Sequence, residues 1–413
     1  MRENFVPDVS GPSSAHRRAR GGIILLLAAL AAIGPLSTTI VLPSFPSMAS
    51  ELGVSTRDLG LTLSAFFISF AVGQLLAGPL SDRLGRRPVV LGGLAIYALG
   101  TIACAVVTSL DGLLAARIVQ ALGVCAASVL SRAIARDLFT GEALAKTLSL
   151  TMIAMAAAPG FSPLLGSALE SHLGWRATFM VLLASGVALV PLYLLALGET
   201  HPSDRRAAHT SAALARAYGS LVIDFRFLLP AAAASLVVGA LNAFFATTPS
   251  ILIGVIGLTS LQLGLFFATT VIVVFAAGMA APKLVHRFGA PAVLKAGLAA
   301  SLLGALLMLA GAAEPSLPMF AFAVAVFLLG MGLVNPVGTA AALQPFGKQA
   351  GLASALLGFM QMALSSVDAF LATRLPLEPM AALGWILGVS SAVALFALVA
   401  IRPSPFRAAP SDS

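Results

Sequence analysis

Two apolar segments of the chain are joined by a short charged turn, Gly78-Pro79-Leu80-Ser81-Asp82-Arg83-Leu84-Gly85-Arg86-Arg87-Pro88. The apolar segment and its turn return in the second half of the chain when the sequence is shifted by 204 residues. The shift aligns Leu61 with Leu265, Leu80 with Leu284, Arg83 with Arg287, Gly85 with Gly289, Val89 with Val293 and Gly93 with Gly297. An apolar segment that recurs together with its charged turn predicts two related halves.

The composition of the whole chain excludes a water-soluble globular protein. Of the 413 residues, 59% are hydrophobic and only 10% are charged, and the mean hydropathy is +1.00. This is more apolar surface than a soluble fold could bury. A helix that crosses roughly 30 Å of hydrocarbon needs about 20 apolar residues, so the chain has room for about twelve crossings.

The apolar runs divide into two sets of six. The first set lies near 21–42, 59–80, 88–108, 112–135, 145–168 and 175–197, and the second near 227–252, 261–284, 291–312, 317–343, 348–372 and 380–401. We therefore predict an all-α membrane protein with twelve transmembrane helices in two six-helix pseudo-repeats. Its parts are a cytoplasmic tail (1–20), an N-terminal half (21–198), a cytoplasmic linker (199–226), a C-terminal half (227–401) and a second tail (402–413). Secondary transporters use this architecture, with the substrate between the halves.

The basic residues predict the orientation in the membrane. If the N-terminus is cytoplasmic, one side collects Arg83, Arg86, Arg87, Arg132, Arg136, Lys146, Arg205, Arg206, Arg216, Arg226, Lys283, Arg287, Lys295, Lys348, Arg402 and Arg407. The other side holds only Arg57, Arg176 and Arg374. Because positive loops stay on the cytoplasmic side, both termini should be cytoplasmic, in a multi-pass inner-membrane protein. The net charge of +8 is scattered over short loops, so we expect no nucleic-acid partner.

The sequence offers no chemistry of an enzyme or a cofactor site. Its two cysteines, Cys104 and Cys125, lie in apolar stretches without the spacing of a metal or redox site. We find no nucleotide-binding loop, metal cluster or catalytic triad, and we expect neither a metal nor a cofactor.

The charged turn at 78–88 resembles the signature loop of the major facilitator superfamily, whose fold is the two-half bundle predicted above. The resemblance implies a conformational gate made by Gly78, Asp82, Arg83, Gly85, Arg86 and Arg87. Gly78 would allow close helix approach and Gly85 a tight turn, while Asp82 would contact the start of the eleventh span near 347–351 and hold the outward-open state. The alternative is a plain cytoplasmic turn fixed by its positive charges.

Arg117 is the only arginine well inside a predicted span, and a charge there is costly enough to indicate a function. Gln120 lies on the same helix face, with Gly123 continuing it. The segment resembles the fourth-span motif of the same superfamily, which implies a role of Arg117 and Gln120 in proton movement or substrate binding. The alternative is an arginine that snorkels to the outer interface.

The fifth span contains Pro159, Gly160, Pro163 and Gly166, a pattern that resembles the proline-glycine motif of exporters in the superfamily. The prolines each remove a backbone donor and bend the helix, and the glycines leave a smooth surface for a neighbouring span. The resemblance places the eighth span opposite, closing the cytoplasmic side. Ordinary kinking is the alternative, since proline and glycine are common in membrane helices.

The first span, from Pro35 to Pro46, resembles that of the bicyclomycin/chloramphenicol-resistance (Bcr/CflA) branch of drug:proton antiporters, but Thr39 stands where that branch has an aspartate. A membrane carboxylate is the usual proton carrier, so proton coupling stays open. Asp368 is the one acid clearly within an apolar run of the second half, although its nearness to Arg374 suggests an interfacial position.

The substrate path should be lined from spans one, four, seven and eleven. The polar or aromatic candidates there are Thr38, Thr39, Asn242, Phe244, Phe245, Gln361 and Asp368, with Arg117 and Gln120. They predict an adaptable, mostly apolar pocket, although each could equally serve helix packing. We expect a monomeric exporter of small drug-like molecules in the lipid bilayer, driven by protons. The alternative is a metabolite exporter or an importer of the same fold.

Overall fold

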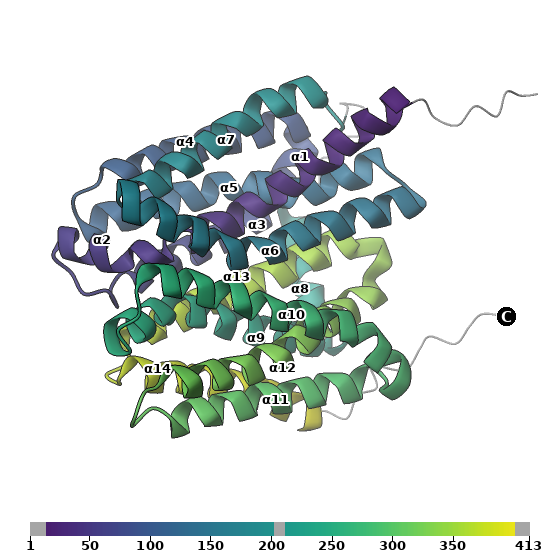
Figure 1. Cartoon of the computed structure of the whole chain (residues 1–413). Helices are drawn as coiled ribbons and strands as arrows, with labels where there is room; N and C mark the ends of the chain where they lie inside the picture. Colours follow the sequence, from purple (N-terminus) through teal and green to yellow (C-terminus); the bar gives the residue numbers. More distant parts are fainter. Residues whose placement is uncertain (1–13, 202–210, 401–413) are drawn as a thin grey trace, which may run out of the picture.

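The computed structural model describes residues 14–201 and 211–400 (Figure 1). Most of the two predicted tails and the middle of the linker, with Arg205, Arg206, Arg402 and Arg407, lie outside the described residues. Two bundles of helices lie side by side, the N-terminal one in purple to teal and the C-terminal one in green to yellow. The long helices of both bundles lie roughly along one common axis.

The N-terminal bundle consists of α1 (Ser14–Thr39), α2 (Phe45–Leu52), α3 (Gly60–Leu84), α4 (Arg86–Val106), α5 (Leu110–Leu138), α6 (Gly141–Leu173) and α7 (Arg176–Ala196), with a short turn η1 (Leu42–Ser44). A linker helix, α8 (Ser211–Val222), follows. The C-terminal bundle consists of α9 (Phe225–Pro249), η3 (Ser250–Val255), α10 (Ser260–Phe288), α11 (Ala290–Ala310), α12 (Leu317–Leu343), η4 (Gln344–Gln349), α13 (Ala350–Arg374) and α14 (Pro379–Ala400). Twelve helices in the described part are long and apolar enough to cross a membrane, as the sequence predicts.

Local sequence signals fix where several of these helices begin. Ser109 accepts a hydrogen bond from the backbone of Gly112 at the start of α5, and Asp224 caps α9 in the same way. Thr259 and Gln262 form a capping box at the start of α10. These caps satisfy backbone donors that helices leave free at their first turn.

The turns after α3 and α10 confirm the internal repeat. Gly85 has φ 97° and Gly289 has φ 80°, a backbone conformation that side chains with a Cβ rarely adopt. Both glycines follow the last residue of one span and precede the first residue of the next. The two turns, 204 residues apart, therefore share their backbone geometry as well as their sequence.

Helix packing follows the same repeat. In the N-terminal bundle α4 packs on α5 and α7, and α1 packs on α5 and α6; in the C-terminal bundle α11 packs on α12 and α14, and α9 packs on α12 and α13. Gly100 lies against the backbone of Gln120, and Gly304, 204 residues later, lies against the backbone of Phe327. Small residues let backbones approach closely where lipid gives no hydrophobic drive for association.

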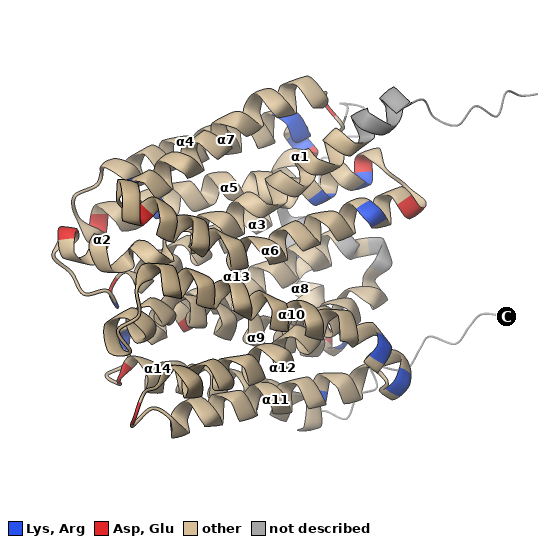
Figure 2. Ribbon diagram, in the orientation of Figure 1, with Lys and Arg blue, Asp and Glu red and all other residues tan. Residues whose placement is uncertain are grey.

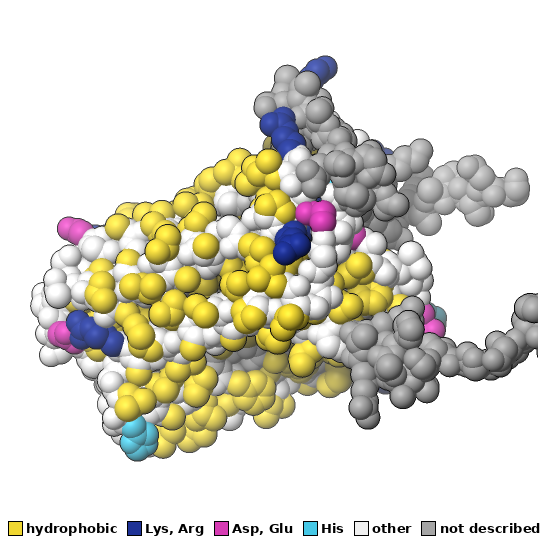
Figure 3. Space-filling view, turned by 90° about the horizontal axis from the view of Figure 1, so that it is seen from above, with side chains coloured by type: hydrophobic (Ala, Val, Ile, Leu, Met, Phe, Trp, Pro, Cys, Tyr) yellow, Lys and Arg dark blue, Asp and Glu magenta, His cyan; other side chains and the backbone are white. Residues whose placement is uncertain are grey.

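Charged residues gather at the two ends of the helices (Figure 2). We call them the α2 end, which carries α2, and the terminal end, near which the described chain starts and stops. Apolar side chains cover the flank between the ends (Figure 3). Exposed examples include Leu25, Leu99, Leu195, Met279, Phe322 and Phe396. An apolar band between charged ends is what a bilayer requires of a spanning protein.

The two halves meet through α3 against α13 and through α6 against α10, which are equivalent pairs in the repeat. At the α2 end, Arg57 donates hydrogen bonds to the carbonyl oxygens of Ala372 and Leu377. Further along the same interface, the hydroxyl oxygens of Ser64 and Ser366 lie 3.0 Å apart. These contacts hold the halves together toward the α2 end.

Candidate transport and gating sites

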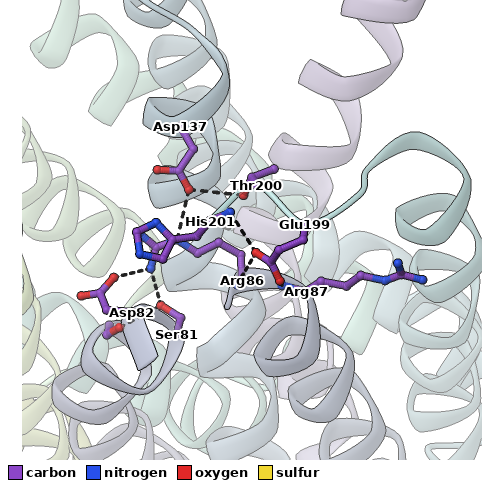
Figure 4. Close-up of polar contacts among 9 residues, drawn as sticks. Ser81, Asp82, Arg86, Arg87, Asp137, Glu199, Thr200 and His201 are labelled. Atoms are coloured by element: carbon purple, nitrogen blue, oxygen red, sulfur yellow. Dashed lines mark hydrogen bonds and ion pairs between the residues drawn. The ribbon is translucent and has the colours of Figure 1, made fainter. Parts of the chain in front are cut away.

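The charged turn between α3 and α4 forms a polar cluster at the terminal end (Figure 4). Arg86 is only 8% exposed, and its guanidinium donates to Asp82 on α3 and, at 3.1 Å, to Asp137 on α5. It also donates to the hydroxyl of Ser81. Bonds between a guanidinium and carboxylates are among the stronger hydrogen bonds in proteins. Arg86 therefore ties together the ends of three helices.

Glu199, which follows α7, caps the N-terminus of α4. Its carboxylate accepts the backbone N–H of Arg86 at 2.8 Å and that of Arg87 at 3.2 Å, and also the backbone N–H of His201. A carboxylate at a helix N-terminus satisfies free donors and the helix dipole. Thr200 donates to Asp137 at 3.2 Å, so the end of the first half is fastened to the turn between α3 and α4.

Sequence reasoning did not identify Asp137 and Glu199 as partners of this turn. Their place in the sequence could have indicated this contact, because Asp137 and Glu199 lie at the ends of spans on the same side of the membrane as the turn. Gly85 does provide the expected turn, but the expected close approach at Gly78 is wrong, since an added Cβ would meet nothing within 4 Å. Asp82 bonds to Arg86 here, and its contact with the residues near 347–351 stays a prediction.

Arg117 lies inside the N-terminal bundle with 1% of its surface exposed, so the snorkelling alternative is wrong. Its Nη1 donates to the carbonyl oxygen of Ser37 at 2.9 Å and to Oε1 of Gln120 at 2.7 Å. The guanidinium also lies 5.0 Å from the ring centroid of Phe66, while Nη2 has no hydrogen-bond partner among the described residues. A buried cation is thus held by neutral groups and an aromatic ring.

The network around Arg117 continues through residues that the sequence did not single out. Gln120 donates to the hydroxyl of Thr101 at 2.9 Å, and Thr101 donates to the carbonyl oxygen of Tyr97. The hydroxyls of Tyr97 and Ser37 lie 3.0 Å apart. The network therefore joins α1, α4 and α5 at one level of the bundle.

The proline-glycine segment of α6 faces two different helices. Gly160 lies against Val271 of α10, as expected for the eighth span, since a Cβ there would overlap the Val271 side chain. Gly166 instead lies against the carbonyl oxygen of Ile40, just after α1, so its expected position opposite the eighth span is wrong. From the other side, Gly264 of α10 packs on Leu164. The segment therefore provides a smooth contact surface for α10 of the C-terminal half and for the residue that follows α1 in the N-terminal half.

Thr38 and Thr39 are both buried near the end of α1. Each hydroxyl donates to the carbonyl oxygen of Pro35, a proline that lies inside the helix. The hydroxyl of Thr39 also lies 2.6 Å from that of Ser162 on α6. Thr39 thus packs against the α6 segment instead of lining an open cavity.

A polar stripe runs along α13 in the C-terminal half. Asn242 on α9 donates to the hydroxyl of Ser365 at 2.8 Å, and Ser365 donates to the carbonyl oxygen of Gln361. Gln361 in turn donates to Asn335 on α12 at 3.3 Å. Asn242, Asn335 and Gln361 are all half-buried.

The remaining sequence candidates, Phe244, Phe245 and Asp368, are buried. The ring centroids of Phe245 and Phe244 lie 5.5 and 5.7 Å from the ring centroid of Phe267, so the three rings form an aromatic cluster. Asp368 is 7% exposed, so its side chain lies inside the helix bundle, and its interfacial depth stays a prediction. Within the described residues, no group of three or more histidine, cysteine, aspartate or glutamate side chains could hold a metal ion.

The sequence model of the Major Facilitator Superfamily matches residues 27–367. The chain is 31% identical to "Uncharacterized MFS-type transporter YdgK" of Bacillus subtilis, covering 93% of this chain and 97% of that protein. It is 29% identical to "Multidrug resistance protein D" of Escherichia coli, covering 90% and 93%. It is 28% identical to "Bicyclomycin resistance protein homolog" of Haemophilus influenzae, covering 91% and 94%.

Among solved structures, the fold is similar to that of the nucleoside transporter NupG, with a TM-score of 0.72 over 93% of this chain and 100% of the other. The sequences of the two are 14% identical. At that identity the likeness concerns the arrangement of helices.

Proposed function

The chain belongs to the major facilitator superfamily, and we propose that it exports small drug-like molecules across the inner membrane by alternating access. The two six-helix halves would rock about a central substrate site, as in other transporters with parallel repeats. The observation that carries the proposal is full-length similarity to relatives named for multidrug and bicyclomycin resistance. The exporter-type segment of α6, with Gly160 packed on α10, supports this direction of transport.

The terminal end is the proposed cytoplasmic side. Apart from the buried Arg117, the arginines and lysines of the described part divide unevenly: Arg57, Arg176 and Arg374 lie at the α2 end and the others toward the terminal end (Figure 2). The positive-inside rule expects this excess on a cytoplasmic face. Because Arg57 and Ser64 join the halves toward the α2 end, we assign this conformation to the inward-facing state. We propose a monomer with no nucleic-acid partner.

The gate turn would act through a change of partners. In this conformation Asp82 and Arg86 form an ion pair. In the outward-facing state the start of α13 would approach α3, and Asp82 would turn to it. Asp82 is the solvent-facing partner of this pair, with 37% of its side chain exposed, so water can replace Arg86 when the contact breaks in each cycle.

Everted membrane vesicles provide the direct test. We expect vesicles that contain the protein to accumulate bicyclomycin or chloramphenicol when respiration acidifies their interior, and a protonophore to abolish this accumulation. Vesicles without the protein are the control. If instead right-side-out vesicles accumulate either compound along an inward proton gradient, export is refuted and the importer alternative gains support.

A further inference from the structure

We propose that Asp368 on α13 is the proton-binding carboxyl group of this transporter, in the C-terminal half instead of the first span. This inference rests on the proposed function, because it concerns the proton that drives export. The starting observation is that the fold buries the side chain of Asp368 without a charged partner. The first span offers no equivalent, since Thr39 occupies the position of the missing aspartate.

The carboxyl group of Asp368 lies beside Gly239 on α9 and Ser390 on α14. One carboxylate oxygen, Oδ2, is fully buried and has no hydrogen-bond partner among the described residues. A Cβ added at Gly239 on α9 would lie 2.5 Å from this oxygen, so only glycine leaves room for it. The side chain of Ser390 on α14 lies beside the carboxyl group. The carboxyl group is therefore enclosed by α9, α13 and α14.

The cations of the elements packed against α13 lie away from Asp368. In their described parts, α12 and α14 contain no charged residue, and the charged residues of α3, α8, α9 and η4 lie toward the terminal end. Toward the α2 end, Arg374 is exposed, and the guanidinium of Arg57 is occupied by the carbonyl oxygens of Ala372 and Leu377. Burying an ionised carboxylate costs far more than burying the neutral acid. Asp368 is thus built to hold a proton in this conformation.

A path for the proton lies on the same face of α13. Gln361, Ser365 and Asp368 are spaced four and three residues apart, which places them in one stripe along the helix. Hydrogen bonds tie this stripe to the two neighbouring helices, since Asn242 on α9 donates to Ser365 and Gln361 donates to Asn335 on α12. Release of the proton along this stripe would leave a carboxylate, and no redox partner is needed.

The position of Asp368 also links the proton to the closure of the transporter. Two residues before it, Ser366 donates to the carbonyl oxygen of Ser64 on α3 and so fastens α13 to the N-terminal half. Loss of the proton would leave an unpaired carboxylate against the backbone of Gly239 and destabilise the packing of α13 on α9. The helix that carries the proton is therefore one of the helices that join the two halves.

The test compares Asp368→Asn with the native protein and with Asp111→Asn, which changes an exposed acid in the first turn of α5. In reconstituted vesicles with an imposed proton gradient, we expect Asp368→Asn to lose gradient-driven accumulation of bicyclomycin and chloramphenicol. It should keep exchange of either compound at equilibrium. Asp111→Asn should behave as the native protein, and Asp368→Glu should restore part of the gradient-driven accumulation.

A second measurement does not depend on the choice of substrate. Infrared difference spectra of the reconstituted protein between acid and alkaline pH should contain the carbonyl stretch of a buried carboxylic acid. This band should be lost in Asp368→Asn, kept in Asp111→Asn and shifted in Gly239→Ala, whose added methyl group crowds the carboxyl group.

The outcomes separate the two proposals. If native vesicles accumulate the compounds and Asp368→Asn retains full gradient-driven accumulation, Asp368 is not the coupling site and the export proposal stands. If the native protein transports neither compound, the export proposal is contradicted, and the infrared band still decides whether Asp368 binds a proton. A native spectrum with no band that depends on Asp368 overturns the inference.

Discussion

The buried charge of Arg117 is the feature of single residues that most constrains this protein. The sequence identified it because an arginine in an apolar run is rare. The structure adds that its partners are neutral groups, the carbonyl oxygen of Ser37 and the amide of Gln120. A guanidinium without an acidic partner, buried between α1 and α5, would hold the end of α1 to α5. It would also attract negatively charged groups to the N-terminal half.

We expect Arg117→Ala to abolish export while the protein still reaches the membrane. The substitution leaves the Ser37 carbonyl and the Gln120 amide without their donor, at a cost of about 1–3 kcal/mol for each buried group. Vesicle transport, together with the amount of protein in the membrane, measures the effect. Arg374→Ala, which removes an exposed arginine, is the control, and near-normal export by Arg117→Ala would contradict the proposed role.

Resemblance at Thr39 is insufficient to locate the proton-binding group. The Bcr/CflA branch has an aspartate at this position, but here the hydroxyl of Thr39 contacts that of Ser162 at 2.6 Å, with no cation among the described contacts. Only the folded protein could show that another carboxyl group, that of Asp368, is buried in the opposite half.

At the scale of elements, the turn between α3 and α4 joins helices that must move. Asp82→Asn should slow turnover severalfold and change substrate binding little. The substituted amide has nearly the size of the native carboxylate but loses the ion pair, while Arg86 keeps Asp137. The maximal rate and the half-saturating concentration in vesicles separate the two effects. Glu142→Gln, which changes an exposed acid at the same end, is the control, and an unchanged maximal rate would count against the gate.

The contact between α6 and α10 offers a test by compensation. Gly160→Ala should reduce export, because its Cβ overlaps Val271, and overpacking of this kind costs roughly 1–3 kcal/mol. Adding Val271→Ala should restore export by removing the overlapping atoms. Gly278→Ala is the matched control, since a Cβ there meets nothing within 4 Å. Failure of the double variant to recover would show that the glycine is needed for a reason other than this contact.

At the scale of the whole molecule, alternating access requires the halves to separate at the α2 end. The pair Ser64→Cys and Ser366→Cys should form a disulfide on oxidation, since the native hydroxyl oxygens lie 3.0 Å apart. The cross-link should stop transport, and a reductant should restore it. Ser64→Cys alone is the control, and the native Cys104 and Cys125 are buried. Full transport by the cross-linked protein would exclude the proposed movement.

Sequence alone determined the number of spans, the repeat and the tight turn between α3 and α4, because these depend on local properties. Hydropathy over about 20 residues decides whether a helix can cross the bilayer. The tight turns need a positive φ at one position each, which glycine supplies at Gly85 and Gly289. Only the tertiary structure decided which polar groups meet. Arg86 bonds to Asp137 and Glu199, Gly166 lies against Ile40, and Asp368 is buried. Helix rotation and packing bring these residues together, and their distance along the chain carries no information about contact.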